Sequence, residues 1–428
     1  MFPLVAATFF MVSGGPYGLE DVVGQAGYGW TLAILIFLPL VWSLPTALMV
    51  GELASAMPDD GGFYVWVTRA LGRFWGFQEA WLSLAASVFD MALYPTLFVT
   101  YLGALAPQLV AGHRAVAWEV ALIVVCVAWN LMGAYDVGEG ARWICLLLLL
   151  PFAFVTVAGL IRGFAWHGAP VAAVDWGRVP GGTAGAALLV AMWNTMGWDN
   201  ASTIAREVQD PQRTYIRAML GAVALVSACY LLPVTAAALG GVNAAQFATG
   251  AWVLVGDQLG GSGLAVEITA GGALTAFAMF NALTMSYARL PFAMAQDGWL
   301  PAALARTNSR RAPWICVLAL GVLWLLALGL NFKRLLVMDV VLYGASLLLE
   351  FVALAVLRAR EPAMARPFRV PGGAVVAWML GVPSAVLLAY AAWASRGEAI
   401  GGYPALGWCA AIVAAGICAF AVAKRRRA

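Results

Sequence analysis

The chain is long and strongly apolar. It has 428 residues, of which 63% are hydrophobic and only 11% are charged, whereas soluble proteins carry about 25% charged residues. The net charge of +3 is small, and Lys and Arg lie in short connectors between apolar runs, which excludes the basic patch of a nucleic-acid-binding protein. Because a bilayer crossing needs only about 20 apolar residues, we predict an all-α polytopic membrane protein that lies in the lipid bilayer.

Apolar runs of membrane-spanning length recur along the whole chain. A window of about 19 residues predicts twelve transmembrane helices in a single domain, residues 1–428. They are expected at residues 2–24, 31–57, 77–105, 116–134, 141–161, 183–208, 218–239, 263–287, 313–330, 337–357, 374–394 and 403–423. The first run lacks the charged start and cleavage site of a signal peptide, so we expect a retained span. The polar stretch 240–261 is expected to form an outer helix on the membrane surface.

Basic residues are unevenly distributed between the two sides of these predicted helices. With the N-terminus inside, 18 of the 24 Lys and Arg residues lie on the cytoplasmic side. The remaining outer residues are Arg114, Arg162, Arg178, Lys333, Arg334 and Arg396. Since cytoplasmic connectors carry the excess of positive charge, we predict a multi-pass protein of the cell membrane with both termini in the cytoplasm.

Side chains that build metal sites and enzyme active sites are scarce. Both histidines, His113 and His167, fall in outer connectors. The six cysteines lie inside apolar runs without metal-ligand spacing and are expected to be small buried hydrophobes. No paired ligands or activated nucleophile can be recognised, so we predict no metal, no cofactor and no enzymatic activity.

Two predicted spans are interrupted. In the first, residues 13–18 read Ser-Gly-Gly-Pro-Tyr-Gly, and glycine and proline both disfavour a helix. In the sixth, residues 196–200 read Met-Gly-Trp-Asp-Asn and place Asp199 within an apolar run. The second break comes five spans after the first, so a second five-span unit would begin with opposite topology. This is the pattern of inverted-repeat transporters, which bind substrate at such breaks. The alternative is that glycine and proline are simply common in membrane helices.

Acidic residues form stripes on two predicted helices. At 100° per residue, an arc of about 80° on the third helix contains Glu79, Ser83, Ser87, Asp90, Tyr94 and Tyr101. One face of the tenth helix carries Asp339, Tyr343, Ser346 and Glu350. A carboxylate inside the bilayer is costly and marks a functional site by default, so these stripes are expected to line an aqueous path. The alternative is that the acids are structural and bond to neighbouring helices.

The expected ligand of these acids is positively charged. No Lys or Arg lies in the middle of any predicted span, so the acids need a proton or a cationic ligand. Glu20 and Asp21 follow the first break, where their charge would compete with a substrate carboxylate, although they could merely satisfy the helix terminus. Trp193 and Trp198 flank the second break and offer aromatic faces to an ammonium group. We therefore predict a transporter that couples proton movement to uptake of an organic cation.

Several segments resemble one known family over nearly the whole chain. They are residues 13–21 (SGGPYGLED), 58–64 (PDDGGFY), 90–95 (DMALYP), 198–203 (WDNAST), 207–211 (EVQDP), 297–301 (DGWLP) and 349–351 (LEF). By these motifs the chain resembles the amino acid, polyamine and organocation superfamily. The acidic first-span motif and segments 90–95 and 349–351 are similar to the polyamine permeases of plants and protozoa.

The resemblance implies a fold and a site. The fold would be a five-plus-five inverted repeat, with a first repeat at about 1–161, a second at about 183–358, discontinuous helices one and six, and two extra helices at about 374–423. Substrate would lie between the broken helices and helices three, eight and ten, with Trp193 as the gating aromatic and Asp199 as an acidic binding residue. The candidate substrate-binding residues are Ser13, Gly14, Gly15, Tyr17, Glu20, Asp90, Tyr94, Trp193, Asn194, Trp198, Asp199, Asn281, Tyr343 and Glu350.

The implied function is secondary active import of a polyamine such as putrescine or spermidine, by proton symport. A permease for a neutral or cationic amino acid on the same fold is the main alternative, and a sensor or structural subunit without flux is a further one. The fifth span lacks the lysine that replaces a sodium ion in some proton-coupled relatives, which leaves the proton carrier unassigned, with Glu350 favoured. Sodium stays an alternative, with Thr284, Ser286 and carbonyls of the first break as its ligands.

Overall fold

The computed structural model describes residues 1–167, 184–328 and 332–427, and these are almost entirely helical. In chain order the elements are α1 (Phe2–Val12), α2 (Glu20–Leu38), the π-helical turn η1 (Pro39–Ser43), α3 (Leu44–Ala56), α4 (Phe63–Leu71), α5 (Arg73–Leu105), η2 (Pro107–Leu109), α6 (Arg114–Asn130), α7 (Ala134–His167), α9 (Ala184–Trp193), η3 (Asp199–Glu207), α10 (Pro211–Leu239), η4 (Ala244–Gln246), α11 (Trp252–Tyr287), α12 (Arg289–Gln296), η5 (Ala302–Ala305), α13 (Trp314–Leu326), α14 (Phe332–Arg360), α15 (Ala374–Leu380), α16 (Val382–Ala394), β1 (Ala399–Ile400), β2 (Tyr403–Pro404) and α17 (Ala405–Arg427). The turns η2 to η5 are 3₁₀ helices.

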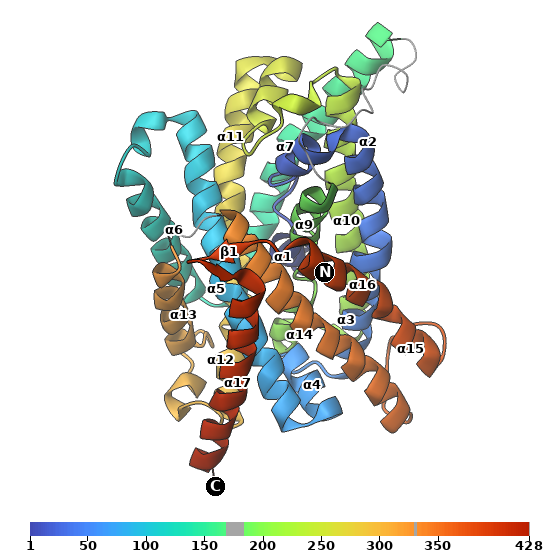
Figure 1. Cartoon of the computed structure of the whole chain (residues 1–428), viewed down its shortest axis with the longest axis vertical. Coiled ribbons are helices and arrows are strands. Elements are labelled where there is room, and N and C mark those ends of the chain that lie inside the picture. The colour runs from blue at the N-terminus through green and yellow to red at the C-terminus, as the bar shows by residue number, and fades with distance from the viewer. Residues whose placement is uncertain (168–183, 329–331, 428) are drawn as a thin grey trace.

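The helices form one bundle. Figure 1 shows α6 and α13 together at one edge, α15 and α16 at the opposite edge, and α5 beside α14 in the middle. The predicted all-α class is confirmed apart from the two-residue strands β1 and β2, which pair in antiparallel fashion before α17. The central position of α5 and α14 is important because these two helices carry the acidic stripes.

Eight helical stretches within the described residues are long and apolar enough to cross a membrane. Among the four other predicted spans, the first and sixth are interrupted, α6 has 17 residues and α13 has 13. Exposed apolar side chains cover the outside of the bundle, as on α7, where Leu147, Leu150 and Ile161 are 61%, 68% and 63% exposed. Such surfaces suit lipid rather than water. Thr183, the predicted start of the sixth span and second repeat, and the predicted outer residue Arg178 lie outside the described residues.

Two glycines divide long helices at the predicted outer side. Gly27 in α2 has a φ of 72° and Gly261 in α11 a φ of 79°, a left-handed conformation that glycine adopts without a steric penalty. Before Gly261, Trp252 and Val255 are fully buried, and Trp252 Nε1 donates to the carbonyl of Pro16 at 2.8 Å. The helical part of stretch 240–261 therefore packs over the first break, and its place at the membrane surface stays a prediction.

Ion pairs gather at one end of the bundle. Ion pairs between described residues lie at or near the predicted cytoplasmic ends of the spans, including Arg69–Glu361, Arg206–Asp59 and Arg310–Asp136. The helix ends and connectors predicted to share a side are thus in contact. Cytoplasmic placement itself stays a prediction.

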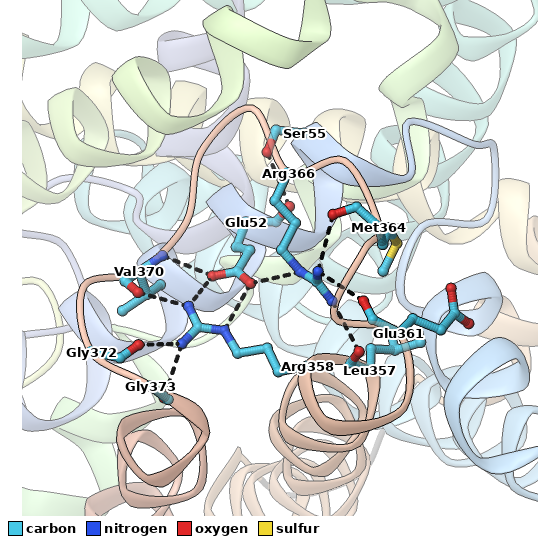
Figure 2. Close-up of polar contacts among 10 residues, drawn as sticks. All are labelled: Glu52, Ser55, Leu357, Arg358, Glu361, Met364, Arg366, Val370, Gly372 and Gly373. Atoms are coloured by element: carbon cyan, nitrogen blue, oxygen red, sulfur yellow. Dashed lines mark hydrogen bonds and ion pairs between the residues drawn. The ribbon is translucent and has the colours of Figure 1, made fainter.

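The most buried of these ion pairs ties α3 to the end of α14. Figure 2 shows the Glu52 carboxylate facing the guanidinium groups of Arg358 and Arg366. Arg358 Nε donates to Glu52 Oε1 at 2.9 Å, and Arg366 Nε lies 3.2 Å from the same oxygen. The Val370 amide donates to Glu52 Oε2 at 2.8 Å, and Arg358 also donates to the Gly372 carbonyl at 3.0 Å. Because the Glu52 and Arg358 side chains are 0% exposed, this cluster fixes the helix ends and the connector after α14.

Candidate functional site

The first break lies between α1 and α2. Gly15 and Gly18 have φ values of 80° and 87°, which favour glycine. A Cβ atom on Gly14 would lie 2.3 Å from Thr275 Cγ2, so only glycine allows this approach to α11. The Thr275 hydroxyl donates to the Gly14 carbonyl at 3.1 Å. The glycine-rich sequence therefore lets the break pack directly against α11.

Backbone amides of this break already have partners. The Gly15 amide donates to Ser13 Oγ at 3.0 Å, and the Gly18 amide donates to Glu20 Oε2 at 2.6 Å. The Tyr101 hydroxyl of α5 donates to the other oxygen of Glu20. These contacts are those expected if Glu20 satisfies the terminus of α2. They also occupy amides that would otherwise be available to a substrate carboxylate.

The second break lies between α9 and η3. Gly197 has a φ of 91°, and its amide donates to the Tyr343 hydroxyl of α14 at 2.9 Å. That hydroxyl in turn donates to the carboxylate of Asp199, which is 1% exposed. A Cβ atom on Gly197 would lie 2.3 Å from the Met11 carbonyl of α1. Tyr343 therefore holds the acid of the second break, and the missing side chain of Gly197 lets the two broken spans touch.

Asn194 joins the two breaks directly. Its side-chain amide donates to the Gly18 carbonyl at 3.2 Å and to the Val190 carbonyl at 2.9 Å. The Tyr230 hydroxyl of α10 donates to the carbonyl of Asn194. The bonds to the Gly18 and Asn194 carbonyls satisfy groups at the helix interruptions, whereas the Val190 carbonyl also accepts from the Asn194 backbone amide at 3.0 Å.

Asp90 of α5 is the second acidic centre. Its Oδ1 accepts from the Tyr94 hydroxyl at 2.7 Å and from Trp193 Nε1 at 3.2 Å, while its Oδ2 lies 3.4 Å from the donating Tyr287 hydroxyl. The Tyr94 and Trp193 rings are stacked with centroids 6.2 Å apart. Asp90 thus lies within an aromatic shell drawn from α5, α9 and α11, and none of these partners is a base.

A small cavity lies beside Asp90 and beside Tyr343, the partner of Asp199. Its walls are formed by Met11, Val12, Asp90, Tyr94, Trp193, Met196, Gly197, Asn200, Tyr287, Asp339 and Tyr343, and its volume is about 10 Å³. That is room for about one water molecule. A second cavity of about 10 Å³ shares Val12 and Trp193 with the first. The conformation is therefore closed, and entry of an organic cation requires the walls to move.

Three more acids extend this region along α5 and α14. Asp339 interacts electrostatically with Asp90. Glu350 and Glu79 interact with Asp199 and with each other. Glu79 and Glu350 are 0% exposed, and neither oxygen of either carboxylate has a hydrogen-bond donor among the described residues. The predicted stripes are thus confirmed as buried faces, and their acids meet across the interface of the two helices.

The structure brings together only part of the predicted site. Asp90, Tyr94, Trp193, Asp199, Tyr343 and Glu350 surround or adjoin the first cavity, and Ser13, Gly14, Gly15, Tyr17, Glu20 and Asn194 build the first break and its contacts. Two others point elsewhere. Trp198 donates to the Thr195 carbonyl at 2.9 Å and is absent from the walls of both cavities. Asn281 accepts from the Asn130 side chain of α6 at 2.7 Å.

The proposed sodium ligands also lie away from the first break. The Thr284 hydroxyl donates to the Phe280 carbonyl at 2.7 Å within α11, and the Ser286 hydroxyl donates to Asn200 Oδ1 at 2.9 Å. The α11 hydroxyl that reaches a first-break carbonyl is that of Thr275. The geometry therefore gives the Thr284 and Ser286 arrangement no support.

Tyr287, Asp339 and Glu79 belong to this region but were not selected as substrate-binding residues from the sequence. Asp339 and Glu79 lie on the predicted acidic stripes, so the helical period does mark them. Tyr287 ends α11, and its sequence surroundings resemble ordinary packing. Only its bond to Asp90 distinguishes it.

Comparison with known proteins agrees with this architecture. A family model described as amino acid permease matches residues 5–420. Polyamine transporter PUT1 of Oryza sativa subsp. japonica is 36% identical over 398 residues, covering 91% of this chain and 72% of that protein. Polyamine transporter RMV1 of Arabidopsis thaliana is 33% identical over 395 residues, covering 91% and 79%. The serine/threonine exchanger SteT of Bacillus subtilis (strain 168) is 25% identical over 384 residues, covering 86% and 83%.

These matches extend over the broken helices, the acidic stripes and the apolar outer surface. The relatives are named as transporters, and the chain is accordingly a transporter rather than an enzyme. This multi-pass membrane protein belongs to the amino acid permease family.

Proposed function

We propose that the protein is a secondary active transporter that imports a polyamine, such as putrescine or spermidine, together with a proton. The observation that carries this proposal is the pair of buried acids at the closed cavity: Asp90 lines it, and Asp199 is held by Tyr343, which also lines it. Their side-chain donors in the described chain are tyrosine and tryptophan. Buried charge without a basic partner is costly, and ammonium groups of a substrate would compensate it.

The proposed architecture is a five-plus-five inverted repeat of ten spans followed by two more. Its support is the spacing of the interruptions after α1 and after α9, each of which leaves a short apolar helix facing a non-helical segment. Counting the interrupted and short helices as spans gives the predicted twelve. The protein would lie in the cell membrane with both termini in the cytoplasm. The end of the bundle that carries the ion pairs would lie on the same side.

Each acidic centre would take one ammonium group of a short diamine. Asp199 would bind the first, because it lies at the second break and is oriented by Tyr343. Asp90 would bind the second, with the Trp193 and Tyr94 rings covering the methylene chain. Ammonium groups interact favourably with aromatic faces by about 0.5–2 kcal/mol. Trp193 lines both small cavities, which suits a side chain that opens and closes access.

Glu350 is the proposed proton carrier. Its carboxylate interacts electrostatically with that of Asp199, and a proton on one of the two acids would remove their repulsion. A cation bound at Asp199 would neutralise the charge that Glu350 faces, and Glu350 could then release its proton more readily. Alternation between a protonated and a deprotonated Glu350 would therefore couple the two movements.

The amino acid alternative needs a carboxylate-binding position at the first break. There the Gly15 and Gly18 amides donate to Ser13 and Glu20, and Glu20 would repel a substrate carboxylate. The geometry thus supports a polyamine over an amino acid.

Uptake into proteoliposomes tests this proposal. Radiolabelled putrescine should accumulate in vesicles with an acidic exterior, and unlabelled spermidine should compete whereas leucine and arginine should not. Competition by leucine or arginine at similar concentrations would establish the amino acid permease instead. The absence of flux of either class would favour the sensor or structural role.

A further inference from the structure

The acids of α5 and α14 form two levels. On α5, Glu79 and Asp90 are 11 positions apart, and on α14 so are Asp339 and Glu350. Eleven helical residues rise about 16 Å and make close to three full turns, so both acids of each helix lie on one face. Asp90 interacts with Asp339 at one level, and Glu79 interacts with Glu350 at the other.

Glu79 has no structural role that its contacts explain. It is 0% exposed, and neither of its carboxylate oxygens has a hydrogen-bond donor among the described residues. A buried acid that served only packing would be expected to carry hydrogen bonds, since an unsatisfied one is costly. The carboxylate instead lies where Asp199 and Glu350 repel it. Such a group is suited to binding a cation.

The surface between the two levels is polar and narrow. Ser83 and Ser87 lie between Glu79 and Asp90 on the same face of α5, and they are 2% and 0% exposed. Asp199 adjoins the same interface from the second break. No Lys or Arg occurs between Glu79 and Asp90 or between Asp339 and Glu350. A linear chain with several positive charges would therefore find an acid at each end and one along its length.

We infer that Glu79 is the inner end of the substrate site, and that it binds the terminal ammonium group of an extended tetraamine whose other end lies at Asp90. This inference rests on the proposed function and deepens it, because it makes the distance between Glu79 and Asp90 a ruler for substrate length. An extended chain advances about 1.2 Å per bond, so the terminal nitrogens are about 6 Å apart in putrescine, about 11 Å in spermidine and about 16 Å in spermine. Spermine matches the separation of Glu79 and Asp90, and putrescine is too short to span it.

Neutralising Glu79 should therefore change selectivity rather than transport as a whole. In Glu79→Gln, the apparent affinity for spermine should fall about tenfold or more, as expected for loss of a hydrogen bond between charged groups, while that for putrescine changes less than about twofold. Glu119→Gln on α6 is the matched control and should alter neither affinity. Equal losses for spermine and putrescine, or no loss for either, would overturn the inference.

Moving the acid tests the ruler more directly. Glu79→Gln combined with Ser83→Asp places the inner carboxylate one turn closer to Asp90, at seven residues or about 11 Å. Preference should then shift from spermine to spermidine. If the preferred length does not follow the position of the acid, Glu79 is not the inner end.

The unaltered protein provides a measurement that does not depend on folding of a variant. A series of unbranched α,ω-diamines should compete with labelled putrescine with increasing affinity up to the length of spermine. A steady fall of affinity with length would refute the ruler but leave polyamine transport intact, whereas failure of every polyamine to bind would refute the proposed function itself. If Glu79→Gln abolishes accumulation driven by a pH gradient and leaves binding of both polyamines unchanged, Glu79 carries the proton and the ammonium assignment is wrong.

Discussion

Removing the charge of Glu52 should destabilise the protein strongly. Glu52→Gln would leave Arg358 and Arg366, whose side chains are 0% and 3% exposed, without their carboxylate. Breaking a buried ion pair by removing one partner costs about 3–5 kcal/mol, a large part of a typical stability of about 5–15 kcal/mol. The backbone carbonyls that also accept from Arg358, those of Val370, Gly372 and Gly373, carry no full charge and cannot replace it.

Glu361→Gln is the matched control because it makes the same chemical change at a residue three positions after Arg358. Its partner Arg69 is 49% exposed and Glu361 is 33% exposed, and the Arg69 guanidinium lowers the pKa of Glu361. An exposed pair of this kind contributes only about 0–1 kcal/mol. Reversible unfolding in mixed detergent micelles gives both free energies. If Glu52→Gln costs no more than Glu361→Gln, the buried cluster does not stabilise the fold as argued.

Three further changes probe the site. Asp90→Asn should weaken a diamine by about tenfold or more and a monoamine far less, since only the diamine loses a charged partner; equal losses would make Asp90 structural. Trp193→Leu should weaken polyamine binding by an amount corresponding to about 0.5–2 kcal/mol, measured by equilibrium binding, and unchanged affinity would remove the ring from the site. Gly14→Ala should reduce the yield of active protein, because its Cβ would lie 2.3 Å from Thr275. Gly263→Ala should not, because no atom lies within 4 Å of the added Cβ. Similar yield and similar uptake per folded molecule for both variants would contradict the close approach at the break.

Local chemistry made much of this architecture predictable. Residues 13–18 predict the first break because glycine and proline oppose helix formation regardless of what surrounds them. The stripes on α5 and α14 were predictable because a helical period assigns residues to faces before any partner is known. The side chains of Ser83 and Ser346 are 2% and 1% exposed, as that periodicity requires.

Pairing between distant segments was not predictable from one sequence. Glu52 and Arg358 are separated by 306 positions, and no periodic pattern links them. Trp198 and Asn281 have the right chemistry for a site, but their side chains bond to Thr195 and Asn130 instead. The burial of Trp252 against the first break was missed because a surface helix and a packed outer helix share the same amphipathic pattern.

The central claim is that Asp199 binds an ammonium group of a substrate whose entry is driven by protons. Its most direct test is uptake of radiolabelled putrescine into sodium-free proteoliposomes with an acidic exterior, comparing wild type, Asp199→Asn and Glu350→Gln at equal amounts of folded protein. Wild type should accumulate putrescine saturably, Asp199→Asn should show no saturable uptake, and Glu350→Gln should lose the response to the pH gradient. Near-normal uptake by Asp199→Asn, or wild-type uptake that requires sodium and ignores the pH gradient, would contradict the account.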